Sequence, residues 1–134
     1  MNPNYPLVAE RAQHRCEYCH APEVIFNVPF KVDHIVPPGK EGVDEPSNWA
    51  LACRICNLRK LDAVDAVDPA TGRRVSLFNP REQTWEDHFE VQGEASFRVT
   101  GTTPVGRATV ERLQMNAPLQ LAARAQWVAL GLFP

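Results

Sequence analysis

Apolar and polar residues alternate over residues 30–36, in the run FKVDHIV. This alternation and the β-branched side chains predict a short β-strand, which should end at the PPG run that follows. Residues 24–28 are also rich in β-branched side chains, and we expect them to form the partner strand. Residues 48–52, NWALA, should return the chain from a surface loop, with Trp49 and Leu51 packing inward.

A helical pattern of apolar residues begins after Cys53, in the run RICNLRKLDAVDAV. The Asp68-Pro69 pair predicts its end, because proline cannot continue a helix. In a helix of that length Asn57, Leu61 and Val64 would share one face, which places the Asn57 amide beside apolar side chains.

The second half of the chain shows weaker patterns. Short strands are expected at 75–78 and 97–101, and a helical turn is expected at 84–89. Thr103 and Pro104 are a typical N-cap and first-turn pair, so they predict a helix through Met115. A last helix should open at Ala117-Pro118 and end near Gly131. We expect Trp85, Phe89 and Trp127 in the core, and His88 as a packing or hydrogen-bonding residue.

A chain of 134 residues with 44% hydrophobic and 22% charged residues is sufficient for one compact domain. The sequence contains no signal-peptide pattern and no apolar run of membrane-spanning length, which favours a cytoplasmic protein with no membrane partner. The formal net charge of -2 gives no overall basic footprint for nucleic acid. Any contact with DNA must therefore come from local basic residues, first of all Arg54, Arg59 and Lys60.

Four cysteines form two Cys-x-x-Cys pairs, and no cysteine is left over. The pairs are Cys16/Cys19 and Cys53/Cys56. Two residues between thiolates allow one turn to present both sulfurs to one ion, and two such turns complete a tetrahedron. This spacing is a strong indication of a structural Zn²⁺ site.

The spacing of the cysteines has two other interpretations, a redox pair and a haem attachment site. A redox pair needs only one Cys-x-x-Cys and leaves the second unexplained. Cys16, Cys19 and His20 also spell the C-x-x-C-H of c-type haem attachment, with Met115 as a distant axial ligand. Haem attachment normally requires export and would leave the second pair without a role, so His20 is expected to be incidental.

The segment between the cysteine pairs resembles the HNH family of nucleases with a ββα-metal core. The motifs that carry the resemblance are Asp33-His34-Ile35, then Asn48, then Cys56-Asn57 with Lys60. Each motif is weak alone, but jointly they are specific. The resemblance covers about the first half of the chain. At the third position of the His-Asn-His triad that gives the family its name, this sequence has Asn57 instead of histidine.

The resemblance implies a role for each residue. His34 would be the general base, because a neutral imidazole with a pKa of about 6.5 can accept a proton from water. Asp33 and Asn57 would bind one catalytic Mg²⁺ or Mn²⁺ through oxygen atoms. Asn48 would tie the loop that positions His34, and a backbone carbonyl is expected to fix the tautomer of His34. Arg54, Arg59 and Lys60 would contact phosphate.

These expectations combine into an α+β fold, with a zinc-braced HNH nuclease core at 1–68 and a mixed α/β C-terminal extension at 69–134. The predicted function is metal-dependent hydrolysis of DNA. The alternative is a non-catalytic zinc-ribbon module that binds nucleic acid. One geometric requirement follows: consecutive residues of a strand point to opposite faces, so Asp33 and His34 can share a site only if the backbone bends or twists there.

Overall fold

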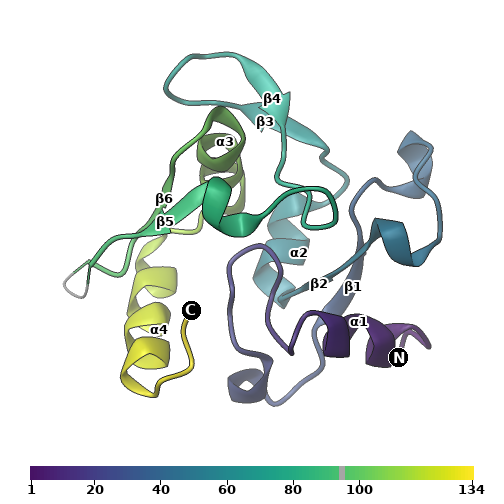
Figure 1. Cartoon of the computed structure of the whole chain (residues 1–134), viewed down its shortest axis with the longest axis horizontal. Coiled ribbons are helices and arrows are strands. Elements are labelled where there is room, and N and C mark those ends of the chain that lie inside the picture. Colours follow the sequence, from purple (N-terminus) through teal and green to yellow (C-terminus); the bar gives the residue numbers. More distant parts are fainter. Residues whose placement is uncertain (94–95) are drawn as a thin grey trace.

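The computed structural model describes residues 1–93 and 96–134 and shows helices combined with short antiparallel strand pairs (Figure 1). The α-helices are α1 (Tyr5–Arg11), α2 (Arg54–Lys60), α3 (Pro104–Leu113) and α4 (Pro118–Ala129). The strands are β1 (Lys31–His34), β2 (Trp49–Ala52), β3 (Asp65–Val67), β4 (Arg74–Ser76), β5 (Phe89–Val91) and β6 (Val99–Gly101). Short 3-10 turns are η1 (Glu23–Phe26), η2 (Pro38–Lys40), η3 (Pro46–Asn48) and η4 (Trp85–Asp87). The predicted α+β class is confirmed.

β1 pairs with β2, and α2 packs against this pair to complete a ββα unit. The predicted strand at β1 is confirmed, but the partner expected at 24–28 is wrong. That segment contains the 3-10 turn η1, because the buried Glu23 carboxylate fixes the chain there. It accepts hydrogen bonds from the Tyr5 hydroxyl at 2.7 Å and the Phe30 amide at 2.6 Å. Trp49 and Leu51 of β2 are buried, as predicted.

Helix α2 is shorter than its apolar pattern predicts. It ends at Lys60, because Leu61 takes a positive φ of 51° that breaks the helical path. The guanidinium of Arg112 in α3 donates to the carbonyls of Arg59 and Lys60 at this end, at 3.0 and 3.3 Å. The expected face of Asn57, Leu61 and Val64 therefore does not form, and Leu61 is exposed.

Several expectations for the second half are confirmed. The Thr103 hydroxyl caps α3 by accepting from the Gly106 amide at 3.0 Å. Trp85, Phe89 and Trp127 are all buried. His88 is within hydrogen-bonding distance of the Thr103 hydroxyl, 2.7 Å from Nδ1, which fits a packing and hydrogen-bonding role.

The C-terminal part packs on the ββα unit. Helix α3 contacts α2 as well as the β3–β4 hairpin, and it lies between these elements and the β5–β6 pair (Figure 1). The predicted division at residue 68 falls in the turn of the β3–β4 hairpin, between strands that pair with each other. Buried side chains from both sides of that residue form one apolar cluster. Among the described helices, none is long and apolar enough to cross a membrane.

Candidate metal centre and active site

The sulfur atoms of both cysteine pairs converge. The ligand atoms of Cys16, Cys19, Cys53 and Cys56 lie within 4.8 Å of one another, and all four residues are buried. Each pair is shaped by a turn in which the first sulfur accepts a backbone N–H. Cys16 Sγ accepts from Cys19 N at 3.5 Å, and Cys53 Sγ accepts from Cys56 N at 3.4 Å. The cluster is positioned to bind a metal ion, and its all-sulfur donor set is consistent with zinc.

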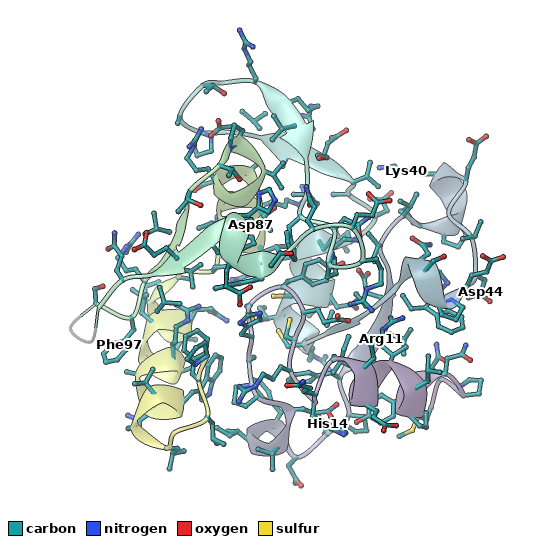
Figure 2. All side chains as sticks on the ribbon, in the orientation of Figure 1. Arg11, His14, Lys40, Asp44, Asp87 and Phe97 are labelled. Carbon is teal, nitrogen blue, oxygen red and sulfur yellow. The ribbon has the colours of Figure 1, made fainter. Side chains whose placement is uncertain are left out.

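The electrostatics of the cluster favour a cation at its centre. Hydrogen bonding with the Cys16 sulfur raises the pKa of both Cys19 and Cys56, and burial of the two thiols raises it further. Four thiolates can coexist in this buried space only with a positive ion between them. Yellow sulfur atoms gather beside α2 in Figure 2, where Cys53 caps the helix and Cys56 lies in its first turn.

The two alternative uses of the cysteines do not fit this geometry. A redox pair or a c-type haem would use Cys16 and Cys19 apart from the other pair, whereas all four sulfurs face one point. His20 does not face a haem site, since its ring stacks on Trp85 with centroids 4.1 Å apart.

Asp33 lies on β1 and is buried beneath α2. Its Oδ2 accepts a hydrogen bond from the Tyr18 hydroxyl at 2.7 Å and lies 3.2 Å from the Lys60 ammonium. Burial raises the pKa of Asp33, although Lys60 and Tyr18 both favour the charged form. Both of these groups contact Oδ2, so Oδ1 is the carboxylate oxygen that could bind a cation.

His34 follows Asp33 but lies in a different environment. Its ring is partly exposed, and Nε2 lies 2.9 Å from Oδ1 of Asp44, in the loop between β1 and β2. Hydrogen bonds from His34 and then from Trp49 lower the pKa of Asp44, so this partner is a carboxylate at neutral pH. The contact at Nε2 is thus a carboxylate rather than the expected backbone carbonyl.

Asn48 ties together the two ends of the same loop. Its Nδ2 donates to the carbonyls of Val36 and Val43, both at 2.8 Å, and its Oδ1 accepts from the Val36 amide at 2.9 Å. The side chain is buried, and all of these contacts are with loop backbone. Asn48 therefore holds the segment after His34 in one shape, which is the geometry a positioning residue needs.

Asn57 lies in α2, directly after Cys56, and is partly buried. Helix α2 packs against β1, the strand that carries Asp33 and His34. No bulge interrupts β1 at Asp33 and His34, because β1 and β2 pair one to one from Lys31 to His34. Because successive side chains of a strand alternate in direction, Asp33 contacts Tyr18 and Lys60. His34 instead contacts Asp44.

The three basic residues expected to contact phosphate differ in their availability. Arg54, at the start of α2, is exposed. Arg59 donates to the carbonyls of Leu113 and Gln114 at the end of α3, at 3.1 and 2.9 Å. Lys60 is only 1% exposed, and its ammonium donates to the carbonyls of His34 and Ile35. The fold itself uses the charge of Lys60, which leaves its ammonium less available to a phosphate than the exposed Arg54.

Sequence reasoning missed two residues that contact the candidate site. Tyr18 lies between Cys16 and Cys19, and a Cys-x-x-Cys turn does not require a particular residue at that position. Asp44 is one of several acidic residues in the loop between β1 and β2, and their charge alone does not single it out. Neither position carried a periodicity or spacing signal, because each contact joins segments that only the folded backbone brings together.

The segment that contains these residues matches a known protein family. Residues 16–62 match the model of the HNH endonuclease family. The matched segment spans both cysteine pairs, β1, β2 and α2. Neither a search of curated proteins nor a search of solved structures found a match.

Proposed function

We propose that the protein is a metal-dependent endonuclease that hydrolyses DNA, because residues 16–62 match the HNH endonuclease family model. The observation that carries the proposal is the content of the matched segment. It contains both cysteine pairs, Asp33 and His34 on β1, Asn48 in the turn η3 before β2, and Asn57 on α2.

In the proposed mechanism His34 removes a proton from the attacking water. Its ring lies at the end of β1 and is 28% exposed, so a water molecule and a phosphate can approach it. Asn48 keeps the loop after β1 fixed, which limits the positions that the ring can take. The water that His34 activates must lie in line with the bond between phosphorus and the leaving 3′ oxygen.

Asp33 and Asn57 would hold the catalytic ion. Their donors are a carboxylate oxygen and an amide oxygen, which suit Mg²⁺ or Mn²⁺. When bound, such an ion supplies charge stabilisation to the phosphate and to the leaving 3′ oxygen. Lys60 already offsets part of the charge of Asp33 at 3.2 Å, so the free protein should bind the ion weakly, and substrate phosphate should complete its ligands.

The four cysteines would hold a structural Zn²⁺ separate from the catalytic ion. Cys56 precedes Asn57 in α2, so the zinc site fixes the start of the helix that carries a proposed ligand. Arg54 is the exposed basic residue of this helix that is best placed to contact the DNA backbone.

A second candidate is a zinc-bound module that binds nucleic acid without cleaving it. The specific observation in its favour is that the four sulfurs form a complete metal site by themselves, within 4.8 Å of one another. The contacts of Asp33 with Tyr18 and Lys60 would then be purely structural.

Cleavage assays separate the two candidates. Purified protein is incubated with supercoiled, linear and single-stranded DNA in Mg²⁺, Mn²⁺ or chelator, beside a His34→Ala variant whose zinc content and melting curve are measured. We expect cleavage by the wild type only with a divalent ion, and a folded, zinc-loaded but inactive variant. Cleavage by His34→Ala at the wild-type rate would contradict the mechanism, and binding without cleavage by the wild type would favour the module.

A further inference from the structure

The contact between His34 and Asp44 determines which ring nitrogen can act as a base. Nε2 of His34 lies 2.9 Å from Oδ1 of Asp44. An ionised carboxylate can only accept hydrogen bonds, so Nε2 must carry the proton of the pair. The neutral ring then has its lone pair on Nδ1.

Asp44 is held in place although its side chain is 77% exposed. The same Oδ1 accepts a second hydrogen bond from the indole Nε1 of Trp49 at 3.0 Å. Trp49 is buried on β2 directly opposite His34 in the strand register. The pairing of β1 with β2 therefore fixes the spacing of His34 and Trp49, the two residues that contact Oδ1 of Asp44.

The backbone around Asp44 is fixed from two more directions. The Asn48 amide donates to the carbonyl of Val43, the residue before Asp44, at 2.8 Å. Arg11 of α1 donates to the carbonyls of Pro46 and Trp49, at 2.9 and 2.6 Å. Figure 2 shows Asp44 at the right-hand edge of the molecule and Arg11 further inward, beside α1. Asn48 thus acts on His34 partly through the position of Asp44.

An exposed ion pair contributes little to stability, because water and salt screen it. The contact is nevertheless built from a strand register, a buried indole and a tied loop. An arrangement of this kind is suited to orienting an imidazole, as a carboxylate does when it selects the tautomer of a catalytic histidine.

We propose that Asp44 is a positioning residue that holds His34 with its proton on Nε2, so that Nδ1 is the atom that accepts the proton from water. The inference rests on the proposed endonuclease function and deepens it. The proton passes from water to Nδ1, and the hydroxide oxygen forms the new bond to phosphorus. The bond between phosphorus and the 3′ oxygen breaks, and the leaving 3′ oxygen takes a proton from solvent water to become a hydroxyl.

The test compares three variants in the cleavage assay. Asp44→Ala removes the carboxylate, Asp44→Glu restores one on a longer side chain, and Glu45→Ala removes a negative charge from the same exposed loop without touching His34. For Asp44→Ala we expect kcat to fall about 10- to 100-fold, with KM changed less than about 2-fold. Asp44→Glu should recover part of the loss, and Glu45→Ala should match the wild type.

A second readout does not depend on cleavage. The ¹⁵N resonances of the His34 ring, identified by their absence from His34→Ala, report which nitrogen bears the proton. The wild type without DNA should show the Nε2–H tautomer, and Asp44→Ala should show a mixture of tautomers.

The possible outcomes are distinguishable. If the wild type cleaves and Asp44→Ala is equally active, the inference is overturned while the proposed function stands. An equal loss in Glu45→Ala would assign the effect to loop charge, and a changed requirement for Mg²⁺ or Mn²⁺ would make Asp44 a metal ligand; either result overturns the positioning role. A wild type in the Nδ1–H form would do so as well. A wild type that cleaves no DNA overturns the proposed function itself.

Discussion

The hydroxyl of Tyr18 donates a hydrogen bond to Oδ2 of Asp33 at 2.7 Å. Tyr18 lies between Cys16 and Cys19, so a residue of the first cysteine turn contacts a proposed ligand of the catalytic ion. Both side chains are buried. The metal centre is therefore connected to the candidate active site at two points, through Tyr18 to Asp33 and through Cys56 to Asn57.

We predict that Tyr18→Phe lowers cleavage activity about 10- to 100-fold with unchanged zinc content, because Asp33 loses a donor that orients it. Stability should fall by roughly 1–3 kcal/mol, since the lost hydrogen bond is to a buried carboxylate. Cleavage rates, zinc analysis and urea unfolding measure the three quantities. Tyr5→Phe is the matched control, because it removes a hydroxyl that donates to Glu23 at 2.7 Å instead. Equal activity of the two variants would contradict a role for Tyr18.

Removal of the structural metal should unfold the ββα unit. In Cys56→Ser we expect loss of bound zinc and loss of the cooperative melting transition, because the buried sulfurs no longer have a cation to hold them together. Circular dichroism during titration with a strong chelator should show the same loss in the wild type. A chelator-treated protein that keeps its melting temperature would show that the metal is not structural.

Arg124 is a buried charge on which the packing of α4 depends. Its guanidinium is 1% exposed and donates to the carbonyls of Phe97 and Met115, at 2.7 and 2.8 Å. Arg124→Met leaves the buried Met115 carbonyl and the part-buried Phe97 carbonyl without this donor, so we expect a loss of about 2–4 kcal/mol in the free energy of unfolding. Urea denaturation measures this loss. Arg98→Met, at an exposed position, serves as the control and should change stability little.

Asp68 makes part of the stability dependent on pH. It is buried at the turn of the β3–β4 hairpin and accepts from Arg107 Nε and Nη2, both at 2.9 Å. The Arg107 hydrogen bonds, followed by those from Ala70 and Thr71, hold the pKa of Asp68 well below its ordinary value. A carboxyl with a lowered pKa in the folded state stabilises the fold above its unfolded pKa of about 3.9. That contribution is lost as the pH falls through the folded pKa.

We therefore expect Asp68→Asn to melt below the wild type at about pH 7, and the difference in melting temperature to shrink as the pH falls below about 4. Asp65→Asn is the control, because its ion pair with Arg74 is exposed on both sides and should contribute little. A difference between wild type and Asp68→Asn that stays constant down to about pH 2 would show that the ion pair is not its source.

By itself, the sequence determined the features that depend on local spacing. Each Cys-x-x-Cys spacing was sufficient to predict a turn that presents two sulfurs together, because such a turn needs only its own residues. The presence of two such pairs then indicated the shared metal site that the structure shows. The Thr103-Pro104 start of α3 and the strand at β1 were predictable for the same reason. The motif formed by Asp33, His34, Asn48 and Asn57 indicated a resemblance to the HNH family, whose model matches residues 16–62.

Only the tertiary structure decided the contacts between distant segments. Helix α2 stops at Lys60 rather than at Asp68 because Leu61 leaves the helical path and Arg112 binds the freed carbonyls. Arg59 in turn donates a hydrogen bond to the Leu113 carbonyl at the end of α3. The Lys60 ammonium donates to the Ile35 carbonyl just after β1. The carboxylate that contacts His34 belongs to Asp44, in a loop. The hydroxyl that donates to Asp33 belongs to Tyr18, in a cysteine turn. Their positions depend on how the backbone closes in space, which residue spacing along the chain does not encode.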